Sequence, residues 1–208
     1  KSASGSTREK WSGVAADLRA HFGPLKVAFT KGPGDGIALA RKHAEAGVPF
    51  IIACGGDGTI NEVANGILQA GADTELGIFP SGTGGDLRRT LGLPTTPRDV
   101  ARALREGETK RMDVGKVSFT DNDGKPEERY FLNVTSFGLA ASIIERVKSN
   151  KAMDWLPLDT IRGRANFALS TLQEVIGIGT TRVMVKIDDD EEQPLSTVNL
   201  CIANARYF

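Results

Sequence analysis

The clearest chemical signal in the sequence is one glycine-rich run, GGDGTINEVANG at positions 55–66. It lies between a predicted buried strand at 50–54 and a predicted amphipathic helix at about 60–70. Glycines let a backbone approach a phosphate and adopt positive φ, and the N-terminus of the following helix offers unpaired N–H groups to an anion. The run therefore predicts a phosphate-binding loop. The alternative is an ordinary glycine-rich turn in which Asp57 only caps the helix.

Asp57 gives this loop a second chemical feature. A carboxylate repels a bare phosphate, so its presence makes chemical sense if it meets Mg²⁺, a bridging water or a hydroxyl group that is to be activated. Asp57 is therefore the candidate catalytic residue.

A second glycine-rich loop repeats the arrangement. The predicted strand 76–79 is followed by PSGTGGD at 80–86 and then by a short helical stretch. Two such loops at neighbouring strand ends could hold one nucleotide between them, whereas either loop alone could be a flexible strand-to-helix connection. Thr30 ends another predicted strand, 25–30, which places a hydroxyl group on the same edge of the sheet.

Several other kinds of site are excluded or disfavoured. The sequence contains no Walker A pattern GxxxxGK[ST] and lacks the VAIK, HRD and DFG motifs of protein kinases. His21 and His43 fall in predicted helices without a nucleophile motif. Cys54 and Cys201 fall in apolar strand-like runs, which predicts buried reduced thiols. The acidic run at 188–192 is expected to be a solvated hairpin tip rather than a cation site.

The elements around the two loops alternate between helix and strand. In chain order the predicted elements are helix 6–22, strand 25–30, helix 35–46, strand 50–54, helix 60–70, strand 76–79 and a helix that begins near Thr96. This alternation predicts an α/β domain with a parallel sheet covered on both faces and with ligands at the carboxyl ends of the strands. We place this nucleotide-binding domain at residues 1–110.

The pattern changes near Arg111, where short strands and hairpin signals begin. The predicted elements are strands at 117–119, 130–134, 181–187 and 195–203, helices at 139–147 and 166–176, and a hairpin turn at DNDG, 121–124. We place a β-rich second domain at 111–208. The chain begins at Lys1 rather than Met and stops directly after a strand-like run, so this domain is expected to be incomplete at its C-terminus.

The composition is that of a folded, soluble protein. Of 208 residues, 40% are hydrophobic and 25% are charged, and 26 Lys and Arg residues balance 26 Asp and Glu residues. The chain therefore has no net positive charge that would attract nucleic acid. Because no apolar run approaches the roughly 20 residues that span a bilayer, and the N-terminus carries no apolar signal-peptide core, a cytoplasmic location is expected.

Two stretches of the sequence carry a resemblance to a known family. GGDGTINEVANG and the downstream LGIFPSGTGGDLRRTLGLP at 76–94 resemble the catalytic domain of diacylglycerol kinases, particularly the soluble bacterial lipid kinases. The similarity continues through RMDVG at 111–115, FLNV at 131–134 and ANARYF at 203–208. The NEVANG continuation favours lipid kinases over NAD kinases, which share the GGDGT core but continue differently.

The resemblance implies a fold similar to that of NAD kinases and 6-phosphofructokinases, with the nucleotide between an α/β domain and a β-sandwich domain. It implies an ATP-dependent kinase that transfers the γ-phosphate to a hydroxyl group of a diacylglycerol-like or sphingoid-like lipid, with ATP and Mg²⁺ as cofactors. The ATP contacts that the resemblance implies are Thr30, Gly56, Asp57, Gly58, Thr59, Asn61, Glu62 and Thr83.

Two departures from the family pattern are visible. Gly85 stands where the family usually has Asn, so any contact made by that side chain is missing. The acidic segment that supplies the family's Mg²⁺ site and its general base is expected beyond Phe208, so no metal ligand is assigned.

Two alternative functions remain open from the sequence: a NAD kinase-like enzyme, and a non-catalytic module that senses a nucleotide or a lipid. The resemblance implies a role in phospholipid biosynthesis and other lipid metabolism. The expected partners are a lipid substrate and, transiently, the surface of a membrane, with no nucleic acid. A homodimer is left open.

Overall fold

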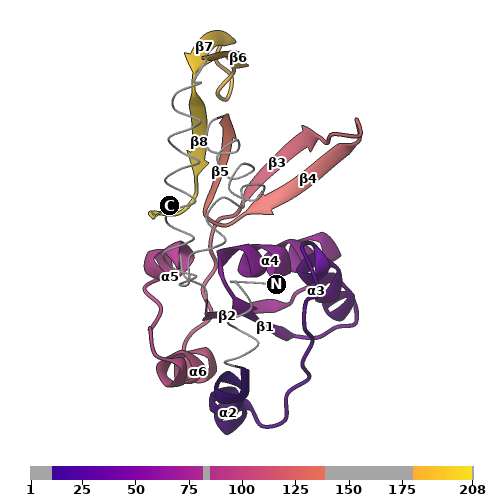
Figure 1. The fold of residues 1–208 in the computed structure, drawn as a ribbon, viewed down its shortest axis with the longest axis vertical. Helices are drawn as coiled ribbons and strands as arrows, with labels where there is room; N and C mark the ends of the chain where they lie inside the picture. Colours follow the sequence, from indigo (N-terminus) through magenta and orange to yellow (C-terminus); the bar gives the residue numbers. More distant parts are fainter. Residues whose placement is uncertain (1–10, 82–84, 139–179, 208) are drawn as a thin grey trace, which may run out of the picture. The chain divides into compact units, whose positions relative to one another are not determined.

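A computed structural model describes residues 11–81, 85–138 and 180–207 of the chain (Figure 1). Contacts divide the chain into two compact units, Lys1–Asn133 with Ala203–Phe208, and Val134–Ile202. The first unit contains α2 (Trp11–Phe22), α3 (Asp35–Glu45), β1 (Phe50–Gly55), α4 (Asp57–Ala70), β2 (Glu75–Pro80), α5 (Asp86–Leu91), α6 (Pro97–Glu106), β3 (Gly115–Thr120) and β4 (Pro126–Phe131). The remaining strands are β5 (Val134–Gly138), β6 (Thr181–Val185), β7 (Gln193–Thr197) and β8 (Asn199–Ala203).

The first unit is built on a parallel pair of strands, as the sequence predicts. β1 and β2 pair in register from Phe50 opposite Glu75 to Gly55 opposite Pro80. Successive side chains of a strand point to opposite faces of the sheet, so each strand contributes to two separate hydrophobic clusters. The carboxyl ends of both strands lie at the same edge, which is where ligands bind in sheets of this kind.

Helices cover both faces of this pair (Figure 1). On one face, α3 and α4 enclose a cluster that includes Ala53 of β1 and Ile60 of α4, both almost fully buried. On the other face, α2 and α6 enclose a cluster around Phe79 of β2, with Leu18 and Val100. The sheet is thus buried on both sides, which explains the continuous apolar runs of β1 and β2.

α3 and α4 cross at a position that only glycine permits. A Cβ added to Gly66 would lie 2.4 Å from the carbonyl oxygen of Ile37 and 2.7 Å from the Cβ of Ala40. No side chain fits such a gap, so the two helices approach through small residues. α4 is therefore closely packed against α3 along the helix that follows the first glycine-rich run.

The start of α6 confirms the predicted helix near Thr96. The Thr96 hydroxyl oxygen accepts a hydrogen bond from the backbone N–H of Asp99 at 3.2 Å, and Pro97 occupies the first turn. Proline fits there because its missing N–H has no partner within a helix anyway.

The predicted strand at 25–30 is wrong. Residues 25–30, which the structure describes, form neither helix nor strand. Val27 and Phe29 are 39% and 45% exposed. The ring of Phe29 contacts the ring of Trp11 edge-on at 5.6 Å. An apolar alternation makes a strand only where a neighbouring strand accepts its hydrogen bonds.

The hairpin predicted around 121–124 is confirmed. β3 and β4 pair antiparallel, and the Asp121 carboxylate accepts hydrogen bonds from the backbone N–H groups of Asp123 and Lys125 at 2.9 and 2.8 Å. The predicted strand 130–134 has the wrong bounds, because β4 ends at Phe131 and β5 begins at Val134.

The second unit contains strands in the two regions, 181–187 and 195–203, where the sequence predicts them. β6 and β7 pair antiparallel, while β5 pairs with β8. The single strand predicted at 195–203 is divided into β7 and β8. The acidic run at 188–192 is exposed at the tip of the β6–β7 hairpin, with Asp188 at φ 50, which confirms a solvated tip. The predicted helices at 139–147 and 166–176 lie outside the described residues.

Three further expectations concern the domain boundary, the two cysteines and membrane-spanning helices. The contact-based division falls after Asn133, whereas the boundary after residue 110 follows the sequence pattern and stays a prediction. Cys54 is half-buried, but Cys201 is exposed, so the expectation of a buried thiol is wrong at Cys201. Among the described residues, no helix combines the length and the apolar character needed to cross a bilayer.

Candidate active site

The first two glycines of the first glycine-rich run, Gly55 and Gly56, form the turn from β1 into α4. Gly56 is the N-cap residue with extended backbone angles, φ −84 and ψ 178, and α4 begins at Asp57, three residues before the predicted start. A Cβ at Gly55 would lie 2.6 Å from the Cβ of Thr59. The glycine at 55 therefore lets the Thr59 side chain lie against the end of the strand, and the turn is tight.

The second glycine-rich loop begins beside the first. Gly55 and Pro80 are register partners in the parallel pair, and the backbone N–H of Ser81 donates to the carbonyl oxygen of Gly55 at 2.9 Å. The two loops thus leave the sheet at adjacent strand ends, as the sequence predicts.

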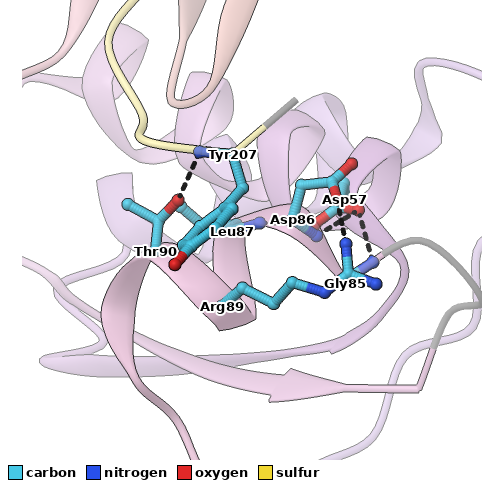
Figure 2. Close-up of polar contacts among 7 residues, drawn as sticks. All are labelled: Asp57, Gly85, Asp86, Leu87, Arg89, Thr90 and Tyr207. Carbon is cyan, nitrogen blue, oxygen red and sulfur yellow. Dashed lines mark hydrogen bonds and ion pairs between the residues drawn. The ribbon is translucent and has the colours of Figure 1, made fainter.

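Asp57 joins the two loops. Its Oδ2 accepts hydrogen bonds from the backbone N–H of Gly85 at 3.0 Å and of Asp86 at 3.4 Å, and its Oδ1 accepts from Leu87 at 3.4 Å (Figure 2). The first N–H groups of a helix have no partner within the helix, and they attract negative charge. The carboxylate of the first loop therefore holds the start of α5, which follows the second loop.

Gly85 has a backbone conformation that explains its residue type. Its φ of 71 and ψ of 32 lie in the left-handed region, which glycine adopts freely and asparagine adopts more readily than most residues. Gly85 stands where the resembling family has Asn, so the backbone requirement of this position is met by both residues. The next residue, Asp86, forms an ion pair with Arg89 at 2.7 Å on the same short helix (Figure 2).

The glycines at 56 and 58 are not needed for positive φ. Gly56 is extended and Gly58 lies in the first turn of α4, so the positive φ expected at this loop is found instead at Gly85. Gly58 is exposed, and no atom of the described residues lies within 4 Å of a Cβ built there. Among the described residues, therefore, nothing beyond the helix itself covers the turn at Gly58.

The next two predicted residues contact backbone groups of other elements. The Asn61 Oδ1 accepts a hydrogen bond from the N–H of Leu132 at 3.3 Å. The Glu62 carboxylate accepts from the N–H groups of Gly34 and Gly36, each at 3.0 Å. Both side chains therefore have structural contacts whether or not they also meet a nucleotide.

The two remaining predicted contacts are threonines. Thr30 is half-buried in the segment before α3, and this segment forms no strand that would place its hydroxyl group at the sheet edge. Thr83 lies outside the described residues. The structure thus brings together Asp57 to Glu62 on α4, directly after Gly56, and joins Asp57 to Gly85.

Asn65 is a structural residue that the sequence analysis did not single out. It is 1% exposed. Its Oδ1 accepts from the N–H of Tyr130 at 2.9 Å, and its Nδ2 donates to the carbonyl oxygens of Tyr130 at 2.8 Å and Asn61 at 2.9 Å. The side-chain amide of Asn65 therefore forms hydrogen bonds with the backbone of β4 at Tyr130, as the backbone of a neighbouring strand would. The sequence gives one sign of this role: Asn65 is a polar amide within the apolar stretch of α4, four residues after Asn61.

The described residues offer neither a metal cluster nor a reactive thiol at this site. They contain no group of three or more His, Cys, Asp or Glu side chains placed to hold a metal ion. Burial raises the pKa of the Cys54 thiol from its ordinary 9.0 to about 12, so the thiol at the end of β1 stays protonated at neutral pH.

Known proteins share sequence with this chain. The model of the diacylglycerol kinase catalytic domain matches residues 1–117. A protein of Chromohalobacter salexigens named “Probable lipid kinase YegS-like” is 40% identical over 121 residues, 57% of this chain and 36% of that protein. The diacylglycerol kinase of Bacillus subtilis (strain 168) is 30% identical over 158 residues, 74% of this chain and 46% of that protein.

The fold is also similar to solved structures. A crystal structure of a diacylglycerol kinase from Bacillus anthracis str. Sterne superposes with a TM-score of 0.67 and 27% identity, and the match covers 100% of this chain and 62% of that one. This similarity confirms the fold class expected from the sequence. The matched segments are less than half the length of the two curated relatives, at 36% and 46%.

Proposed function

The chain belongs to the diacylglycerol kinase catalytic domain family, and from this premise we propose that the protein transfers the γ-phosphate of ATP to a lipid hydroxyl group. The acceptor is a diacylglycerol-like or sphingoid-like lipid. The observation that carries the proposal is the meeting of two glycine-rich loops at one sheet edge, through Ser81 N–H to Gly55 O at 2.9 Å and Gly85 N–H to Asp57 Oδ2 at 3.0 Å.

The first turn of α4 supplies the phosphate contact in this proposal. A helix of 14 residues presents unpaired N–H groups and partial positive charge at its N-terminus. The exposed Gly58 leaves that turn uncovered by the described residues, so an anion can reach the backbone closely. These properties support binding of a nucleotide phosphate beside Gly56 and Gly58.

Asp57 has two tasks in the proposal. A carboxylate has about four positions at which it accepts hydrogen bonds. Three backbone N–H groups, of Gly85, Asp86 and Leu87, point at the two oxygens. The remaining capacity is enough to orient the hydroxyl group of the acceptor lipid, while the existing contacts keep the second loop in place.

Mg²⁺ neutralises phosphate charge when it is bound together with ATP. The described residues bring together no cluster of three or more potential ligands, and the oxygens of Asp57 face backbone N–H groups. We therefore assign no residue of this chain as a Mg²⁺ ligand. Positioning of the phosphates and of the acceptor is what the residues of this chain contribute.

The decisive experiment uses the full-length protein, γ-labelled ATP and a mixed lipid extract, with NAD tested in parallel. The proposal predicts labelled lipid whose mass exceeds that of its parent by one phosphate group. Labelled NAD phosphate instead would indicate a NAD kinase-like enzyme. Binding of ATP without any labelled product would indicate a nucleotide-sensing module. A cytoplasmic location and transient membrane contact belong to the same proposal and are tested by fractionation.

A further inference from the structure

Glu62 connects α4 to the loop before α3. Its Oε1 accepts a hydrogen bond from the backbone N–H of Gly34, and its Oε2 accepts from Gly36, both at 3.0 Å. These residues are 28 and 26 positions away in the sequence. The carboxylate therefore occupies the N-terminus of α3, where unpaired N–H groups attract negative charge.

A second carboxylate shapes the same loop from within. The Asp35 Oδ2 accepts hydrogen bonds from the N–H groups of Lys31 at 2.6 Å and Gly32 at 3.2 Å. Gly34 lies in the left-handed region at φ 85. Two carboxylates thus hold the backbone from Lys31 to Gly36, that of Asp35 within the loop and that of Glu62 on α4. This loop directly follows Thr30.

The close approach of Glu62 depends on glycine at position 36. A Cβ added to Gly36 would lie 2.7 Å from the Oε2 and 2.8 Å from the Cβ of Glu62. Any side chain at this position must push Glu62 away. By contrast, a Cβ built at Gly13 of α2, outside this loop and without positive φ, meets no described atom within 4 Å beyond its own stretch of helix.

We propose that Glu62 is a positioning residue that fixes the loop from Lys31 to Gly36 as one wall of the nucleotide site, and that it does not itself contact ATP. The inference rests on the proposed ATP-dependent function. Each Glu62 oxygen accepts a hydrogen bond from a backbone N–H group of this loop. A carboxylate would repel the phosphates of ATP, so its charge is better placed on a helix N-terminus than on the ligand.

A loop that is not held in advance must be ordered when the ligand binds, and this weakens binding without changing the chemical step. Loss of the Glu62 contacts should therefore raise KM for ATP and leave kcat nearly unchanged. A role of Glu62 in the transfer step would instead lower kcat.

The test compares Glu62→Ala, Glu62→Gln and Gly36→Ala with the matched control Gly13→Ala, all in the full-length protein. Amide hydrogen exchange at Gly34 and Gly36 is measured by NMR without nucleotide, and KM and kcat are measured with ATP. We expect Glu62→Ala and Gly36→Ala to speed exchange by roughly 10-fold and to raise KM by a similar factor, with kcat within about 3-fold. Glu62→Gln keeps one acceptor oxygen, so its exchange rates and its KM should lie between those of the parent and those of the other two variants.

Gly36→Ala separates the two possible roles, because it keeps the Glu62 carboxylate but displaces it from the loop. Unchanged exchange in Glu62→Ala would overturn the inference, as would faster exchange with unchanged KM. A raised KM in Glu62→Ala together with a parental KM in Gly36→Ala would show direct contact with ATP and would also overturn it. If the parent protein uses no ATP, the proposed function fails, and the exchange measurement alone decides whether Glu62 holds the loop.

Discussion

The carboxylate of Asp57 accepts a hydrogen bond from the backbone N–H of Gly85 at 3.0 Å, across 28 residues of sequence. This contact joins the two glycine-rich loops. It connects the end of β1, where Asp57 begins α4, to the residue that precedes α5 (Figure 2). A change at Asp57 should therefore affect both the acceptor hydroxyl and the position of the second loop.

Asp57→Asn should reduce kcat/KM for phosphotransfer at least ~100-fold, the range expected for loss of a group that helps move a proton. One amide oxygen can still accept from Gly85 and Asp86, but the NH₂ group then faces the N–H of Leu87. We expect the free energy of unfolding to fall by only about 1 kcal/mol. Steady-state kinetics and chemical denaturation measure the two effects. Activity within a few-fold of the parent protein would remove the catalytic role.

A matched control for this variant is Glu45→Gln. Glu45 is exposed on α3, and its carboxylate pairs with Arg41 at 2.7 Å, one helical turn away. Exposed pairs of this kind contribute little, about 0.3–0.5 kcal/mol. This variant should keep both full activity and full stability, so a general effect of removing a carboxylate can be separated from the effect of removing Asp57.

Gly58→Val should weaken ATP binding by roughly 10-fold or more while leaving the fold unchanged. Gly58 lies in the helix without positive φ, and a Cβ there meets no atom of the described residues within 4 Å. Any loss of affinity must then come from blocking a ligand rather than from strain. Gly13→Val in α2, where a Cβ is equally free of described neighbours, is the control. Isothermal titration measures both, and equal ATP affinity in the two variants would count against the phosphate-loop interpretation.

Asn65→Leu should destabilise the protein by roughly 3 kcal/mol. The substitution keeps the approximate size of the side chain but leaves the N–H and the carbonyl of Tyr130 without their partner, and each unsatisfied buried group costs about 1–3 kcal/mol. Denaturant unfolding of the parent and the variant measures the change. Leu68→Ala, at a 38% exposed position of the same helix, should cost much less. If Leu68→Ala were as costly as Asn65→Leu, the edge contact of Asn65 would not be the cause.

The two cysteines should differ in reactivity toward a maleimide. Burial raises the pKa of Cys54 to about 12, whereas Cys201 is exposed. At pH 8 the native protein should therefore label at Cys201 only, and Cys54 should label after unfolding. Rapid labelling of native Cys54, located by peptide mass, would contradict this assignment.

The same shift sets the sign of a pH effect on stability. The folded protein keeps the Cys54 proton more tightly than the unfolded chain does, because the folded pKa of about 12 exceeds the ordinary value of 9.0. The contribution of this group is therefore complete below pH 9 and is lost as pH rises from 9 toward 12. Cys54→Ala should show a smaller alkaline loss of stability than the parent in this range.

The sequence predicted the parts of the fold that depend on local pattern. Strands β1 and β2 were located within one residue at each end because both are buried on two faces and bounded by glycine or proline. The ends of these two strands also located the two glycine-rich loops. The start of α4 was missed by three residues, because Asp57, Gly58 and Thr59 have low helix propensity and tertiary packing decides their conformation.

The remaining features depend on contacts between distant residues. The segment 25–30 has the alternation of a strand, but pairing cannot be determined from one strand alone. The partner of Asp57 at Gly85 and the partners of Glu62 at Gly34 and Gly36 are backbone N–H groups, which every sequence position except proline offers. Residue type alone therefore gave no sign of which loops these carboxylates hold.

Transfer of label from ATP to lipid tests the central claim most directly. The full-length protein is incubated with vesicles that contain diacylglycerol or a sphingoid lipid and with ATP labelled at either the γ- or the α-phosphate. The lipid fraction is then counted for the parent and for Asp57→Asn. The account predicts labelled lipid from γ-labelled ATP only, with at least ~100-fold less product from the variant. Equal labelling by parent and variant, or no labelled lipid from the parent across diacylglycerol and sphingoid acceptors, would contradict it.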